Sequence, residues 1–171
     1  RNFQVRLPLE SEDELGRLNE SFNRVIEGLA DLEVAKVVQE TFFPQESLTA
    51  AGWEIDGLCR TAGKVGGDYY DYFVLPDGRW ILLLGDVSGH GTAAALIVAM
   101  AKAVVRHPDT PPEPSIILEY LQRQLVQTAK RRRMMSCLVA LYDPSTSTLR
   151  VSNAGHCYPY LCSEQDGTEI R

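Results

Sequence analysis

The chain has 171 residues, of which 44% are hydrophobic and 23% charged, and its formal net charge is −6. This composition indicates a globular protein with one ordinary core, and the acidic balance argues against nucleic acid as a partner. No apolar run reaches the roughly 18 to 20 residues of a membrane span and no signal peptide opens the sequence, so we expect the chain itself to be cytoplasmic. Four cysteines without a CxxC pair favour reduced thiols over disulfides or zinc ligands.

The first 43 residues are predicted to form an extended segment followed by one long helix. Acidic residues after Ser11 suit the positive N-terminal end of a helix, and Pro44 ends it. Apolar residues then recur at spacings of three and four, the pattern of a coiled-coil seam. We expect this stripe to pair with a second helix in a homodimer; packing of the helix on its own domain is the alternative. The stripe consists of Leu15, Leu18, Phe22, Val25, Leu29 and Leu32.

From Trp53 onward the pattern changes to short β-like runs. Two of the connections between these runs read as hairpin turns, at 76–78 and 143–145. Strands in hairpins with helices grouped between them predict an α+β fold with mainly antiparallel pairing. The predicted strands are 53–59, 68–75, 79–87, 134–143, 148–155 and 157–162, and the predicted helices are about 92–106 and 115–128.

Two turns rich in glycine and aspartate are the strongest indication of a functional site in the sequence. Gly66, Gly67 and Asp68 precede one strand, and Asp86 follows the apolar run 81–85. A carboxylate at the end of an apolar strand loses hydration and therefore needs a compensating partner. Two such carboxylates, with a backbone carbonyl near Val87, form an oxygen ligand set that suits magnesium or manganese.

Each turn alone also has a plain interpretation, because aspartate and glycine are ordinary turn residues. Gly89 and Gly91 begin a predicted helix, but no Lys-Ser or Lys-Thr pair follows, so a phosphate-binding P-loop is not supported. His90 and His156 are candidates for a general acid or base, with a solvated loop histidine as the alternative for both. Arg131–Arg133 are either a contact for a phosphorylated partner or a solvated charge run.

Four motifs taken in order resemble the SpoIIE/RsbU branch of the bacterial metal-dependent protein phosphatases (PPM, type-2C-like). They are VGGDYYDYF, GDVSGHGTAAAL, MMSCLVALYD and VSNAGHCYPYL. Upstream, LPLESEDELGRLNESFNRVIEGL resembles the second half of a HAMP domain, a dimeric relay that follows a membrane helix in receptors. These resemblances divide the chain into a partial HAMP segment at 1–33, a linker helix at 34–48 and a phosphatase domain at 49–171.

The phosphatase resemblance implies a fold, a cofactor and a reaction. The fold is an antiparallel β-sandwich flanked by helices in an α/β/β/α arrangement, with two Mn²⁺ or Mg²⁺ ions between the sheets. Asp68 and Asp86 match the family's acidic ligands and catalytic positions, and Val87 matches a ligand that binds through its backbone carbonyl. The implied reaction is hydrolysis of phosphoserine or phosphothreonine by a water that the metals activate. The implied substrate is a phosphorylated anti-sigma-factor antagonist of the STAS type, within partner-switching control.

The family pattern continues past residue 171 into a DG-type turn that supplies further metal-binding aspartates, and we expect the native protein to contain it. The leading interpretation is the phosphatase output of a HAMP-coupled receptor at the cytoplasmic membrane, switched by movement of the helix from Leu15 to Phe42. The alternative is a catalytically inactive pseudophosphatase, a scaffold that binds a phosphoprotein.

Overall fold

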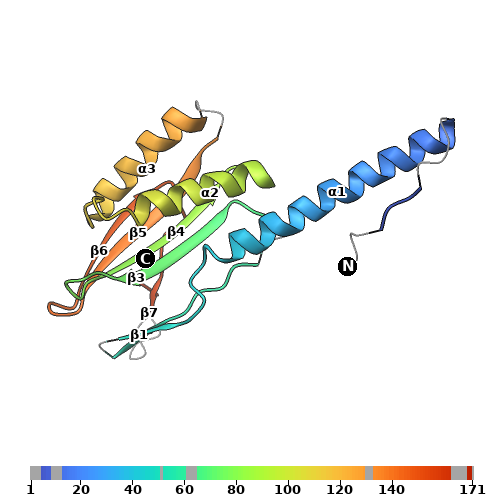
Figure 1. Ribbon diagram of the computed structural model, residues 1–171. Coiled ribbons are helices and arrows are strands. Elements are labelled where there is room, and N and C mark those ends of the chain that lie inside the picture. Colours follow the sequence, from blue (N-terminus) through green and yellow to red (C-terminus); the bar gives the residue numbers. More distant parts are fainter. Residues whose placement is uncertain are drawn as a thin grey trace.

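The computed structural model describes residues 5–8, 13–50, 52–60, 65–129, 133–162 and 169–170. Figure 1 shows a long helix, a curved sheet and two helices that cover one face of this sheet. The elements are α1 (Glu14–Glu40), β1 (Leu48–Ala50), β2 (Trp53–Ile55), β3 (Asp68–Val74), β4 (Trp80–Val87), α2 (Thr92–Val105), α3 (Pro114–Ala129), β5 (Met135–Asp143), β6 (Thr148–Ala154), β7 (Leu161–Cys162) and β8 (Glu169–Ile170).

The main sheet has four antiparallel strands in the order β3-β4-β5-β6. Both predicted hairpin turns lie in it, one between β3 and β4 and the other between β5 and β6. Two small sheets, β1-β2 and β7-β8, complete the described strands. The predicted α+β antiparallel fold is therefore confirmed. The described residues form one helix-covered layer of the implied sandwich; they do not form a second sheet of comparable size.

Two predicted strands are shorter in the structure than the sequence pattern suggested. The run 157–162 contributes only Leu161–Cys162 to a strand, and Pro159 within it has no N–H to donate to a ladder. The run 53–59 contributes only Trp53–Ile55. Beyond that strand the Gly57 carbonyl accepts a hydrogen bond from the Tyr70 hydroxyl at 2.9 Å, so a side chain of the main sheet takes the place of a strand partner.

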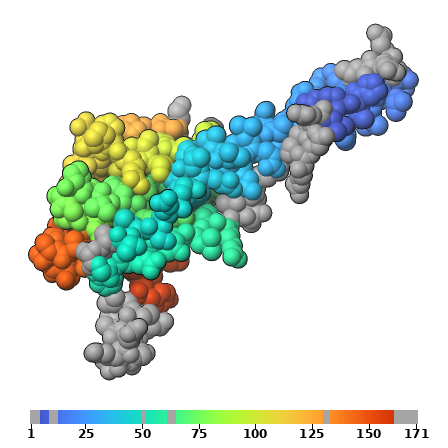
Figure 2. Space-filling model, turned by 60° about the horizontal axis from the view of Figure 1, so that its bottom comes forward, coloured from blue at the N-terminus to red at the C-terminus, as the bar shows by residue number. Residues whose placement is uncertain are grey.

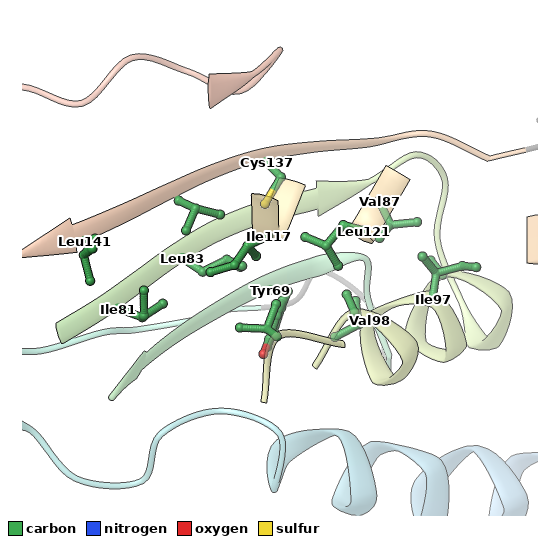
Figure 3. Close-up of a cluster of buried hydrophobic side chains, with 14 residues drawn as sticks. Tyr69, Ile81, Leu83, Val87, Ile97, Val98, Ile117, Leu121, Cys137 and Leu141 are labelled. Atoms are coloured by element: carbon green, nitrogen blue, oxygen red, sulfur yellow. The ribbon is translucent and has the colours of Figure 1, made fainter. Parts of the chain in front are cut away.

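The core lies between the main sheet and helices α2 and α3. Alternate residues of β4, including Ile81, Leu83 and Val87, are buried on the helix side, while Leu84 and Asp86 are exposed on the opposite face. Figure 3 shows Ile81, Leu83 and Val87 in one buried cluster with Ile97 and Val98 of α2. Each buried side chain of this size contributes about 1.5–3 kcal/mol, so the period-two pattern fixes which face of the sheet the helices cover.

A charged cluster interrupts the helix side of the sheet. The Asp71 side chain is completely buried there and accepts hydrogen bonds from the Tyr69 hydroxyl (2.9 Å) and the Arg106 Nε (2.8 Å), with Lys102 Nζ at 3.5 Å. Arg106 also stacks over the Phe73 ring. Burial and the neighbouring Asp71 charge raise the pKa of Tyr69, so its hydroxyl keeps its proton. The cluster fastens the C-terminal half of α2 to β3.

Helix α1 projects away from the rest of the molecule, as Figures 1 and 2 show. It begins at an N-cap on Asp13, whose carboxylate accepts from the backbone N–H groups of Leu15 and Gly16. The helix is continuous across residue 33, the predicted end of the partial HAMP segment, and it ends at Glu40, before Pro44. No helix among the described residues is long and apolar enough to cross a membrane.

The predicted apolar stripe of α1 is exposed along its first half. Leu15, Leu18 and Val25 are each about 60% exposed, and Phe22 is 42% exposed. The segment 5–8 folds back along a different side of the helix. It is held there by two hydrogen bonds between the Leu7 backbone and the Asn23 side chain (2.8 and 2.9 Å) and by a salt bridge between Arg6 and Glu27.

Candidate active site

Asp68 and Asp86 stand directly opposite each other at one end of the β3–β4 ladder. Directly paired residues in an antiparallel ladder point to the same face, with Cβ atoms about 4.5–5.5 Å apart. Because their neighbours Tyr69 and Val87 are buried under the helices, both aspartates lie on the opposite, exposed face. The two acids that the sequence analysis singled out, 18 positions apart in the chain, are thus brought together by strand pairing.

Gly67 holds the third predicted group, the Val87 carbonyl, close to this pair. The Val87 N–H donates to the Gly67 carbonyl at 3.0 Å. A Cβ at position 67 would lie 2.4 Å from the Val87 oxygen, which is closer than real Cβ contacts allow. Residue 67 must therefore be glycine for the backbone at Val87 to keep this position.

The donor set at this end of the sheet fits a hard divalent cation. Two carboxylates and a backbone carbonyl are oxygen ligands of the kind that Mg²⁺ and Mn²⁺ prefer. Within the described ranges, no three His, Cys, Asp or Glu side chains form a metal-binding cluster. The roles of Asp68, Asp86 and Val87 as metal ligands remain a prediction.

Ser136 extends the row of polar groups to the next strand. It pairs directly with Asp86 across the β4–β5 ladder, and its Oγ shares a 2.9 Å hydrogen bond with His156 Nδ1. The sequence pattern indicated His156 as a candidate but not Ser136. Its serine in an otherwise apolar strand could have been noticed, but only the strand register shows that it stands beside Asp86. His90, by contrast, is exposed, and its ring has no hydrogen bond to any described residue.

The loop from Ser88 to Gly91 is fixed by the chain before β5. The Ser88 N–H donates to the Met134 carbonyl (2.8 Å), Met134 N–H donates to Ser88 Oγ (2.9 Å), and Arg133 Nη1 donates to the Ser88 carbonyl (2.7 Å). Gly89 has φ +90°, and a Cβ there would lie 2.2 Å from Arg133 Nη1. Gly89 thus lies directly against the Arg133 side chain, whereas Gly91 has open space around it. The other members of the predicted basic run, Arg131 and Arg132, lie outside the described residues.

Helix α1 reaches the other acidic loop through Gln39. This side chain is only 4% exposed, and it binds both backbone groups of Gly66, two residues before Asp68. Lys102 of α2 donates a hydrogen bond to the Phe42 carbonyl, just beyond the end of the helix. In the sequence, the only indication of Gln39 is its place as a polar residue beside the apolar residues of VVQETFFP, and its burial is known from the structure alone.

A cysteine nucleophile is not supported at this site. Cys59 lies near Asp68, and burial followed by the negative charge of Asp68 raises the pKa of its thiol. Burial also raises the pKa of Cys137, to about 12. Since the thiolate is the reactive form, both groups are poor nucleophiles at neutral pH. Cys59, Cys137 and Cys157 are free thiols, as the sequence predicted.

The sequence model of the family described as Stage II sporulation protein E (SpoIIE) matches residues 76–171, more than half of the chain. The chain belongs to the SpoIIE family. This SpoIIE-family chain is 28% identical over 140 residues to phosphoserine phosphatase RsbU of Bacillus subtilis (strain 168), covering 81% of the chain and 42% of the relative. It is 24% identical over 144 residues to phosphoserine phosphatase RsbP of the same organism, covering 81% of the chain and 35% of the relative.

The fold of the SpoIIE-family chain also has a solved counterpart. The SiaA-PP2C domain of Pseudomonas aeruginosa superposes with a TM-score of 0.57 at 20% identity, covering 75% of this chain and 54% of that one. The predicted SpoIIE/RsbU-type PPM identity and fold are confirmed. The chain spans less than half of the length of the curated relatives that it matches. The HAMP resemblance stays a prediction.

Proposed function

We propose that this chain is the catalytic output domain of a metal-dependent phosphoserine or phosphothreonine protein phosphatase. The observation that carries the proposal is the direct pairing of Asp68 with Asp86, with Val87 beside them, on an exposed face of the sheet. The naming of two relatives as phosphoserine phosphatases supports the same activity.

In the proposed mechanism the protein binds the metal ions, and the ions supply positive charge at the site. Asp68, Asp86 and the Val87 carbonyl would hold two Mn²⁺ or Mg²⁺ ions. When bound, such ions lower the pKa of a water and offset negative charge on phosphoryl oxygens. The protein then needs no nucleophile of its own, which agrees with the raised pKa of the nearby Cys59 thiol.

The proposed substrate is a phosphorylated STAS-type anti-sigma-factor antagonist in a partner-switching pathway. Both aspartates are exposed. An exposed pair is accessible to a phosphorylated side chain presented on the surface of another folded protein, whereas a deep pocket would favour a small molecule.

The proposed assembly is a homodimer through α1, acting as the output of a HAMP-coupled receptor whose parent protein is anchored in the membrane and faces the cytoplasm. The exposed stripe supports a second copy as the occupant, because segment 5–8 binds the helix through Asn19, Asn23 and Glu27 and leaves Leu18 and Val25 at least 60% exposed. Movement of α1 would reach the site through Gln39, which binds Gly66.

The alternative function is a pseudophosphatase that binds a phosphoprotein without hydrolysing it. Both functions use the same fold and the same exposed face.

The deciding experiment measures phosphate release from a phosphorylated STAS protein by the full-length protein with Mn²⁺. The proposal expects Mn²⁺-stimulated release that Asp86→Asn and Asp68→Asn abolish. The matched control is Asp77→Asn, a carboxylate in the turn at the other end of the same hairpin, paired with Arg79. Retained activity in Asp86→Asn contradicts the enzyme, and binding of the phosphoprotein without release by the wild type indicates the scaffold.

A further inference from the structure

The row of polar groups on the exposed face continues past the predicted ligands. Asp68 pairs with Asp86 across one ladder, and Asp86 pairs with Ser136 across the next. These residues point to the same face, with about 5 Å between successive Cβ atoms. The imidazole of His156 is bonded to Ser136 Oγ at 2.9 Å and therefore lies next in the row.

The turn that carries His156 does not need a histidine. Asn153 accepts from the His156 N–H at 2.8 Å and donates to its carbonyl at 3.0 Å, so both turn contacts use the backbone of residue 156. Gly155 supplies the left-handed conformation of the turn with φ +73°. The ring of His156 has one hydrogen bond to the described residues, the bond to Ser136. The turn thus fixes the place of residue 156 through its backbone and makes no use of the imidazole.

The Ser136 contact selects which ring nitrogen can exchange a proton. A hydroxyl oxygen accepts a hydrogen bond from Nδ1–H in both the neutral and the protonated ring. The hydrogen bond to Ser136 occupies Nδ1 in either tautomer of the ring; in the tautomer in which Nδ1–H donates to Ser136 Oγ, Nε2 carries the transferable proton of the protonated ring. This arrangement suits a general acid, because the ring orientation and the reactive nitrogen stay the same before and after transfer.

We propose that His156 is a catalytic residue that donates a proton from Nε2 to the leaving serine or threonine oxygen, and that Ser136 is its positioning residue. The inference rests on the proposed phosphatase function. In the reaction, the oxygen of water forms a bond to phosphorus and the bond from phosphorus to the side-chain oxygen breaks. The side-chain oxygen takes the proton from His156 Nε2, and a proton released by the attacking water returns to Nε2. The products are the free hydroxyl and inorganic phosphate.

The experiment compares two substrates of the full-length protein with Mn²⁺: a phosphoserine peptide and p-nitrophenyl phosphate. A serine alkoxide leaves poorly without a proton, whereas p-nitrophenolate is a stable anion. His156→Gln should lower kcat for the phosphoserine peptide about 100-fold and leave the rate with p-nitrophenyl phosphate nearly unchanged. Ser136→Ala should show the same selectivity with a smaller loss. His107→Gln, an exposed histidine between α2 and α3, is the matched control and should alter neither rate.

Three outcomes would each overturn the assignment and leave the phosphatase function intact. They are an equal loss of kcat on both substrates in His156→Gln, no loss of kcat on the phosphoserine peptide in His156→Gln, and a selective loss in His90→Gln instead. A wild type that hydrolyses neither substrate overturns the function and the assignment together. Nitrogen-15 NMR of the ring gives a readout independent of turnover. A protonated Nδ1 in the wild type that exchanges faster in Ser136→Ala supports the proposal, and a ring that is protonated only at Nε2 and unaffected by Ser136→Ala contradicts it.

Discussion

Gln39 binds both backbone groups of Gly66: its Nε2 donates to the Gly66 carbonyl at 2.7 Å and its Oε1 accepts from the Gly66 N–H at 3.0 Å. One side chain of the long helix thus forms hydrogen bonds with both the N–H and the carbonyl of Gly66, two residues before Asp68. Both groups are buried or half-buried. The helix end and the acidic loop are therefore held in one relative position, and a displacement of either would break two hydrogen bonds.

Gln39→Ala should destabilise the fold and weaken metal binding. Leaving the Gly66 groups unpaired costs about 1–3 kcal/mol, and the loop that carries Asp68 loses its anchor. Urea unfolding measures the first effect and calorimetric titration with Mn²⁺ the second. Gln127→Ala, an exposed glutamine on α3, is the matched control. Unchanged Mn²⁺ affinity in Gln39→Ala would show that this pair does not position the site.

Gly67→Ala should abolish the metal response without unfolding the protein. The added Cβ would lie 2.4 Å from the Val87 oxygen, so that carbonyl or the Asp68 loop must shift. Displacements of about 1 Å at a catalytic centre commonly cost on the order of 100-fold in rate. The measurement is the rise in melting temperature on adding Mn²⁺, followed by turnover. Gly28→Ala is the control: it has open space around it in α1 and should stabilise the helix by about 0.5–1 kcal/mol.

Asp71→Asn should lower the free energy of unfolding by roughly 3 kcal/mol, because removing one member of a buried ion pair leaves the other uncompensated. The loss lies at the lower end of the range for such pairs, since the Arg106 side chain is 38% exposed. Chemical denaturation measures it. The same change at the exposed Asp77, whose partner is Arg79, should cost much less, because ion pairs in water contribute little to stability. Equal costs at the two positions would refute the structural role given to burial.

The double variant Leu18→Glu/Val25→Glu should convert the proposed dimer into a monomer. Both side chains are at least 60% exposed, and carboxylates at these positions would face each other across a helix pair. Sedimentation equilibrium reports the mass. Asp31→Lys changes a charge on the opposite side of α1 and should leave the dimer intact. A wild-type protein that sediments as a monomer at high concentration would contradict the assembly.

The sequence was a good guide wherever local pattern determines structure. The α2 and α3 helices and both hairpins follow from apolar periodicity and turn residues, and each was predicted within about two residues. The runs 53–59 and 157–162 were overestimated, because a β-like composition does not ensure a strand partner. Asp68 and Asp86 could be selected early from their places beside glycines at strand ends, although the loss of hydration expected for Asp86 does not occur, because both carboxylates lie on the exposed face of the sheet.

The sequence by itself determined the fold class, the long exposed helix and the two acidic turns, because these depend on spacing within a short stretch of chain. Only the tertiary structure decided which residues from distant segments of the chain contact one another. Strand register placed Ser136 beside Asp86, and helix packing carried Gln39 to Gly66 and Arg106 to Asp71. Such pairings arise when distant segments bury a common core. The free energy of that burial depends on the whole domain, so the sequence of a single segment does not reveal the pairing.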